Sequence, residues 1–293
     1  MAWRKIEKLG NISIFLFIIS FLNVIFVFIL RKLIINSRIN SIITIHKLIS
    51  YLLDIPIIYY FIRNNKNKKY FIKKEKIGIK NFVNYYSLMF FIGLLINIIS
   101  VMPKIIMENK KSDILYDYSS YNINIIIFSV IIIAPIIEEL MFRGVIMNDL
   151  KEYGYKSAVI INSVLFGLSH IEISKVIMTT LLGIIFSYVA YRYSLKCSIL
   201  LHVIWNLNSG IGTIFYFNKI PEEILILSMG GLSLVLFLIF IIGIIKRKYT
   251  DIFFMFKFNK RDKENTILFL KNNIIFLFII MIMFFLNNYY WYL

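Results

Sequence analysis

The chain has only one cysteine, Cys197, and only three histidines among its 293 residues. A single cysteine excludes an intrachain disulfide framework and a metal site built from several thiolates. Cys197 itself is predicted to pack as a small apolar residue at the start of a helix. The sequence also lacks internal repeats, low-complexity linkers and any stretch with the composition of a soluble domain. Any chemistry is therefore carried by a few polar side chains in an apolar background.

Acidic residues are scarce as well: 16 Asp and Glu stand against 33 Lys and Arg, which gives a formal net charge of +17. In a soluble protein such an excess would indicate nucleic acid, but 59% of the residues are hydrophobic, far more than a soluble domain of this length needs. The basic residues cluster in short loops between apolar runs. Membrane topology and anionic lipid on the cytoplasmic side account for them, and no nucleic-acid partner is expected.

The apolar runs predict an all-α bundle of eight or nine transmembrane helices in one membrane domain, residues 1–293. The predicted spans are 12–30, 42–62, 85–102, 123–147, 157–172, 175–191, 197–217, 224–245 and 267–286. The second is the weakest, because it contains His46, Lys47, Asp54 and Pro56. No small-residue cleavage site follows the first, so we interpret it as a retained helix rather than a signal peptide.

The basic residues also predict the orientation of the chain in the membrane. Counted by loop, 22 Lys and Arg fall on the side of the N-terminus and 8 on the other. The positive-inside rule then places the N-terminus in the cytoplasm. The Lys-, Asn- and Ile-rich composition suggests a bacterial plasma membrane.

Two adjacent glutamates interrupt a run of isoleucines in the fourth predicted span. A carboxylate in a lipid-embedded helix costs at least about 2.5 kcal/mol, so the pair is expected to face a protein interior or a wet cavity. Glu139 and Arg143 are spaced i and i+4 and can pair, whereas Glu138 points about 100° away and needs another partner. Pro135 cannot donate to the carbonyl of Ile131, which is expected to loosen the helix one turn before the glutamates.

Two histidines lie in the spans that follow. His170 ends the stretch 166–170, and His202 precedes Asn206 by one helical turn, which puts imidazole and carboxamide on one face. Taken singly, each could simply bond a neighbouring helix. Taken together with the glutamates, they form the set of groups that water-activating hydrolases use: an acid, two imidazoles and an amide donor.

These residues lie in three ordered motifs, 138–144, 166–170 and 202–206. The motifs resemble those of the CPBP family, which comprises the CAAX prenyl endopeptidases of type 2 and bacteriocin-processing or Abi-type membrane proteins. The resemblance covers about 123–217, the expected catalytic core, with further transmembrane helices on both sides (1–122 and 218–293). It implies an intramembrane endopeptidase whose helices enclose a conical polar cavity.

The resemblance also implies roles for the motif residues. Glu138 would activate the attacking water with the help of His170. His202 and Asn206 would donate hydrogen bonds to the oxyanion of the tetrahedral intermediate.

In the same scheme, Glu139 and Arg143 would brace the site. The cofactor remains open, since members of the family have been discussed as metalloenzymes. Glu138, His170 and His202 could supply three ligands to a zinc-like divalent ion, with the fourth position left for water. Against this, the zinc signature His-Glu-x-x-His is absent and an amide beside the second histidine favours a donor pair, so we favour the metal-free scheme.

Competing functions use the same polar groups. A membrane carrier could move a proton or ion along them, and an immunity or scaffold protein could keep the fold and bind a membrane partner. A carrier has no need for Asn206, and a scaffold needs none of the set. The preferred prediction is therefore an endopeptidase acting on a membrane-associated protein or peptide, of CAAX type or related to bacteriocin processing and self-immunity. No feature of the sequence selects between these substrates.

Other polar residues in the spans are expected to be structural. Some would make interhelical hydrogen bonds, and small residues would permit close helix approach. The first group is Asn162, Asn208, Ser187 and Thr179, and the second is Gly144, Gly167 and Gly183.

Overall fold

The computed structural model describes residues 75–106, 127–170 and 173–274, together with Ile55, Tyr59 and Phe278. The described part is helical, with short turns and no strand, so the predicted all-α class is confirmed. The predicted span 12–30 and nearly all of 42–62, with His46 and Asp54, lie outside the described residues.

The helices include two π-helical turns, η3 and η4, and two 3-10 turns, η5 and η6. In chain order the elements are α3 (Ile79–Ile106), η3 (Ser129–Ile133), α5 (Ala134–Glu139), η4 (Leu140–Ile146), α6 (Met147–Leu150), η5 (Lys151–Tyr153), α7 (Tyr155–Leu168), α8 (Ile173–Arg192), α9 (Leu195–Phe217), α10 (Glu222–Ile245), α11 (Thr250–Phe253), η6 (Phe254–Phe256) and α12 (Lys260–Asn272). Among the described residues, four stretches are long and apolar enough to cross a membrane: Ile79–Ile99, Lys175–Arg192, Leu195–Tyr216 and Glu222–Ile245.

The helices α8, α9 and α10 begin and end within about two residues of their predicted bounds, which is the usual uncertainty of helix ends. Capping and charged residues at the N-termini of α9 and α10 favour these starting points. The Ser194 hydroxyl accepts a hydrogen bond from the backbone N–H of Cys197 and so caps α9. Pro221 precedes α10, and its first turn carries Glu222 and Glu223, whose charges suit the positive end of the helix dipole.

One predicted span differs from the structure, and another is only partly described. For the span 157–172 the structure has α7, which ends at Leu168. Its 14 residues extend about 21 Å, short of the roughly 30 Å of a bilayer core. The span 267–286 overlaps α12, which begins earlier, at a capping box between Asn259 and Asp262, and ends at Asn272. Nearly all of the rest of this span, from 275 on, lies outside the described residues. A short apolar helix and a full span look alike when only hydrophobicity is counted.

In the fourth predicted span, 123–147, the described residues 127–147 form a helix divided into α-helical and π-helical segments. The π turns η3 and η4 flank the single α-helical segment α5. Pro135 lies in the first turn of α5, directly after η3, so the predicted loosening of the helix before the glutamates is confirmed. π turns inside helices often occur at functional sites.

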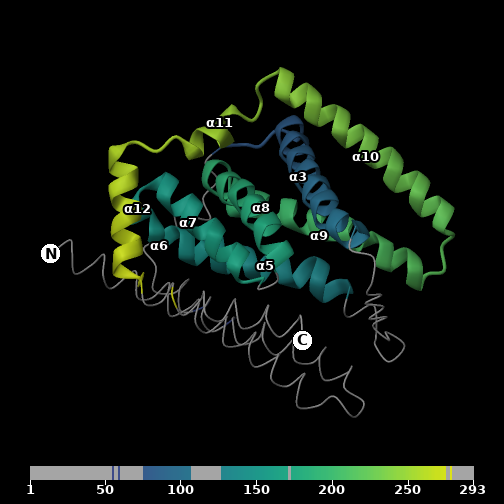
Figure 1. Ribbon diagram of the computed structural model, residues 1–293, viewed down its shortest axis with the longest axis horizontal. Coiled ribbons are helices and arrows are strands. Elements are labelled where there is room, and N and C mark those ends of the chain that lie inside the picture. Colours follow the sequence, from purple (N-terminus) through teal and green to yellow (C-terminus); the bar gives the residue numbers. More distant parts are fainter. Residues whose placement is uncertain are drawn as a thin grey trace, which may run out of the picture.

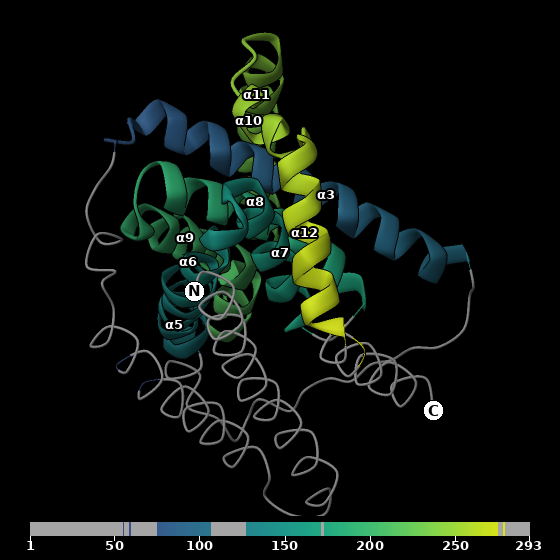
Figure 2. The ribbon, with the colours of Figure 1, turned by 90° about the vertical axis from the view of Figure 1, so that its left-hand side faces the viewer.

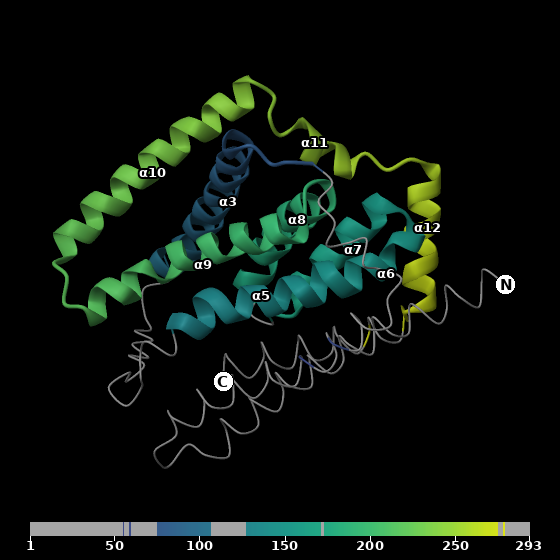
Figure 3. The ribbon, with the colours of Figure 1, turned by 180° about the vertical axis from the view of Figure 1, so that it is seen from behind.

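The helices pack around α8 and α9. In Figure 3, α9 runs between α8 and α5, and it contacts both. Figure 1 shows α3 and α10 side by side along one edge of the molecule, where they pack together. At the opposite end, α12 stands against α7 (Figure 2). Most side chains of α10 are exposed and apolar, as expected of a surface that faces lipid.

Small and polar residues join α7 to α8. A Cβ atom on Gly167 would overlap the Thr180 hydroxyl and lie 2.8 Å from the Val176 carbonyl oxygen. At Gly183 a Cβ would lie 3.1 Å from a ring carbon of Phe166. The prediction of close approach is thus confirmed at both glycines.

The remaining structural predictions have mixed outcomes. Asn162 donates a hydrogen bond across the α7–α8 interface to Ser187 at 3.1 Å, as predicted. Thr179 instead bonds a carbonyl of its own helix, that of Lys175, at 2.7 Å. Gly144 permits no unusually close approach, because a Cβ there would meet only ordinary contacts, the nearest at 3.6 Å.

Candidate active site

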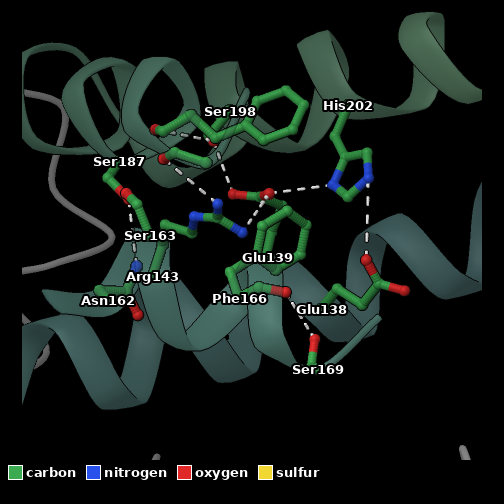
Figure 4. Close-up of polar contacts among 12 residues, drawn as sticks. Glu138, Glu139, Arg143, Asn162, Ser163, Phe166, Ser169, Ser187, Ser198 and His202 are labelled. Atoms are coloured by element: carbon green, nitrogen blue, oxygen red, sulfur yellow. Dashed lines mark hydrogen bonds and ion pairs between the residues drawn. The ribbon is translucent and has the colours of Figure 1, made fainter. Parts of the chain in front are cut away.

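Glu139, the last residue of α5, is the centre of a buried polar cluster (Figure 4). Its side chain is fully buried. One carboxylate oxygen accepts from Arg143 Nη1 at 2.9 Å and from His202 Nδ1 at 3.0 Å. The other accepts from Ser198 Oγ at 2.6 Å. Three donors from two helical elements offset the cost of burying this charge, and the predicted pairing with Arg143 is confirmed.

Arg143 is held between aromatic rings. The guanidinium carbon lies 4.2 Å from the ring centre of Phe166 and 5.3 Å from that of Phe186, and Nη2 donates to the Gly183 carbonyl at 3.3 Å. Cation–π contacts of this kind gain strength when water is excluded, and the Arg143 side chain is fully buried. The ion pair with Glu139 is therefore fixed to α8 as well as to α9.

His202 projects from α9 between the two glutamates. Its ring stacks on Phe186, with centres 4.5 Å apart and an interplanar angle of 21°. A carboxylate accepts and cannot donate, so Nδ1 carries the proton in the bond to Glu139. The other ring nitrogen, Nε2, is thereby turned toward Glu138 and lies 3.8 Å from its Oε2.

Glu138 is less enclosed than Glu139. Its side chain is 25% exposed, while that of Glu139 is 0% exposed. The separation of 3.8 Å from His202 is too long for a hydrogen bond. A water molecule lying beside that pair could contact both groups at about 2.8 Å. The two neighbouring acids therefore differ: Glu139 is fully buried and accepts from three donors, whereas Glu138 is partly exposed and faces His202 beyond hydrogen-bond distance.

His170 lies in the turn after α7, where Nδ1 is 2.9 Å from the carbonyl oxygen of Phe166. A carbonyl only accepts, so this bond places a proton on Nδ1 and leaves Nε2 of the neutral ring as an acceptor. The Phe166 ring packs edge-on against His170 at 5.0 Å and against His202 at 5.9 Å. Both predicted histidines thus contact the same phenylalanine, which links the second motif to the third.

Asn206 is joined to a different part of the site. Its side-chain amide donates to the backbone carbonyl of Val130, in η3, at 3.0 Å. The amide carries a second N–H, which this bond does not use. The structure therefore joins the amide to the backbone of the fourth predicted span, about two helical turns before the glutamates.

The candidate metal ligands can be tested against the geometry. Within residues 75–106, 127–170 and 173–274, no group of three or more His, Cys, Asp or Glu side chains is arranged to hold a metal ion. The Nδ1 atoms of both imidazoles are engaged with oxygen acceptors, which leaves Nε2 as the ring atom that could bind an ion.

Sequence reasoning missed three residues of the site. Ser198 precedes His202 by four residues and Asn206 by eight, so all three share one face of α9, and that spacing could have revealed it. Phe166 opens the motif 166–170, but its contacts with Arg143 and both histidines were not predicted. Phe186 carried no signal, because 17% of the chain is aromatic and most such residues simply pack in apolar surroundings.

Residues 120–208 match the family model described as type II CAAX prenyl endopeptidase Rce1-like. The chain carries an Rce1-like domain. The matched range contains all of the motif residues: Glu138, Glu139, Arg143, His170, His202 and Asn206. No curated protein and no solved structure matches the chain. The Rce1-like family is a family of membrane proteases, so the predicted resemblance and the predicted enzyme class are confirmed.

Proposed function

We propose that the Rce1-like domain is an intramembrane endopeptidase that hydrolyses a peptide bond in a membrane-associated protein or peptide, with Glu138 as the base. The observation that carries this proposal is the contrast between the adjacent acids. Glu139 is fully buried and accepts from three donors, so it is not free to take a proton from water. Glu138 is partly exposed and faces His202 Nε2 without a direct hydrogen bond.

In the proposed reaction, water beside Glu138 attacks the carbonyl carbon of the scissile bond as its proton passes to the Glu138 carboxylate. His170, fixed by the Phe166 carbonyl, keeps Nε2 available to assist this transfer. The tetrahedral intermediate then loses the C–N bond, and the proton taken by Glu138 goes to the departing amine. The products are a new carboxylate and a new amino terminus.

Stabilisation of the oxyanion is assigned to His202 and the second N–H of Asn206. The bond from His202 Nδ1 to Glu139 sets a condition on this role. Nε2 can donate at the same time only when the ring carries both protons. The carboxylates of Glu138 and Glu139, at 3.8 and 3.0 Å, are the groups that would balance that charge.

We further propose that this chemistry needs no metal ion, because Glu138, His170, His202 and Asn206 together supply a group for every step of the reaction. Elemental analysis of the purified protein addresses this part of the scheme. Stoichiometric zinc whose removal by chelators abolishes cleavage would contradict it.

The proposed substrates are a CAAX-type protein or a bacteriocin-type peptide at the plasma membrane. The decisive experiment compares protein termini, by mass spectrometry, in cells that carry the wild-type protein, Glu138→Gln or Glu223→Gln. Glu223 is an exposed carboxylate in the first turn of α10 and serves as the matched control. We expect a set of new termini with the wild type and with Glu223→Gln, and their loss with Glu138→Gln at equal protein level.

A Glu138→Gln protein that still produces the full set of termini would rule out Glu138 as the base. If none of the three proteins changes any terminus, the endopeptidase itself is contradicted. A carrier or a scaffold would then account better for the same polar groups.

A further inference from the structure

The π turn η3 leaves one backbone carbonyl without a backbone donor. In this turn the N–H of Ala134 donates to the carbonyl of Ser129, five residues earlier. The next carbonyl along, that of Val130, would receive the N–H of Ala134 in an α-helical register or that of residue 135 in the π register. Ala134 is already committed, and residue 135 is a proline, which has no N–H.

The side chain of Asn206 takes the place of the absent donor. Its amide donates to the Val130 carbonyl oxygen at 3.0 Å, a normal hydrogen-bond length. The two helical elements are close here, since a Cβ on Gly210, one turn further along α9, would lie 3.3 Å from Ile131. Val130 is exposed on the surface of the described structure, and within a membrane span that surface meets lipid, which offers no donor to a carbonyl. An unpaired carbonyl there would cost about as much as a lost hydrogen bond, so this contact holds η3 against α9.

The position of this contact matters for the acids. Glu138 follows Pro135 by three residues in the same element, and His202 precedes Asn206 by one turn on α9. The bond from Asn206 to Val130 therefore joins the two elements one turn beyond His202 on α9 and about two turns before Glu138, which faces His202 at 3.8 Å. A shift of η3 along α9 would change that separation directly.

We propose that Asn206 is a positioning residue: its amide supplies the N–H that Pro135 lacks, and this fixes Glu138 opposite His202. The expected effect on cleavage rests on the proposed function. The hydrogen bond and its effect on the backbone are independent of that function. Asn206 then has two roles: one N–H of its amide holds η3, and the other is left to donate to the oxyanion of the tetrahedral intermediate.

The test is a double-mutant cycle between Asn206→Ala and Pro135→Ala. Pro135→Ala returns a backbone N–H that can donate to Val130 in the existing register. Cleavage of an identified substrate should fall in Asn206→Ala. Adding Pro135→Ala should raise kcat by about tenfold with little change in KM, the size of coupling shown by residues that share one hydrogen bond. Asn208→Ala, on another face of α9, is the control and should show no coupling to Pro135→Ala.

A measurement without substrate separates this inference from the proposed function. Hydrogen exchange of the detergent-solubilised protein should be faster in peptides covering 130–140 for Asn206→Ala, and Pro135→Ala should slow it again. Exchange unchanged by Asn206→Ala would overturn the positioning role whatever the activity. Independent, multiplicative effects of the two substitutions on kcat would overturn it as well, and would leave Asn206 with the oxyanion alone.

Discussion

Glu138 and Glu139 show how strongly one residue of offset changes an environment inside a helical membrane protein. Successive side chains diverge by about 100°, so the second glutamate points to α9 and Arg143 while the first points to the gap beside His202. The i, i+4 spacing was sufficient to predict the ion pair from sequence. It could not predict that Ser198 and His202 donate to the same carboxylate, because contacts between helices depend on their relative placement.

The buried ion pair should be needed for stability. Arg143→Ala or Glu139→Ala leaves a fully buried partner charge without its counterion, which typically costs about 3–5 kcal/mol. We expect both variants to accumulate poorly and to unfold at a clearly lower temperature in detergent than the wild type, as followed by intrinsic fluorescence.

A paired substitution sharpens this expectation. Replacing both residues by methionine removes both charges at similar length, so Glu139→Met with Arg143→Met should be less destabilised than either alanine variant. The double variant should still be less stable than the wild type, because Ser198 and His202 lose their hydrogen-bond acceptor. Glu264→Ala, an exposed residue of α12, is the control. If the single variants unfolded at the same temperature as the wild type, the ion pair would contribute nothing to stability.

At the scale of helices, the sequence predicted where most of them lie but not which segments are π-helical. Apolar length alone located α8, α9 and α10, and Pro135 marked the weakened turn. The π turns η3 and η4 were not predictable, since an i to i+5 bond leaves no pattern in composition or period. The short α7 was missed for a related reason: hydrophobicity alone does not show where a helix stops within the bilayer.

Close contact between α7 and α8 supports the second motif. Gly167→Ala would place a methyl group against the Thr180 side chain and the Val176 carbonyl, so α8 has to move away from α7. Overpacking of this kind usually costs about 1–3 kcal/mol. Because His170 follows Gly167 by three residues, both unfolding temperature and cleavage rate should fall.

Gly230→Ala provides the matched control for this change. Gly230 lies in α10, and a Cβ there would meet no atom within 4 Å. Alanine should be neutral or slightly stabilising at this position, since it favours the helix over glycine. If Gly167→Ala behaved like Gly230→Ala, the tight packing of α7 on α8 would not be what holds His170 in place.

For the whole molecule, charge pattern and structure agree on which loops share one face. Arg192, at the end of α8, lies 3.2 Å from Glu75 Oε2 and also pairs with Asp251 after α10. The Lys and Arg count alone assigns all three segments to the same side. A salt bridge across a membrane is not possible, so their contact supports the grouping. The positive-inside rule predicts that this shared face is the cytoplasmic one.

The orientation can be tested at the two ends of α10. Its 24 residues extend about 36 Å, enough to cross a bilayer core of roughly 30 Å, with Lys219 just before it and Lys248 just after it. Because Cys197 is the only cysteine, Cys197→Ala gives a background in which Lys219→Cys or Lys248→Cys is the single thiol. We expect a membrane-impermeant maleimide to label Lys219→Cys in intact cells and Lys248→Cys only after permeabilisation. The reverse pattern would invert the topology, and labelling of both from one side would mean that α10 does not span the membrane.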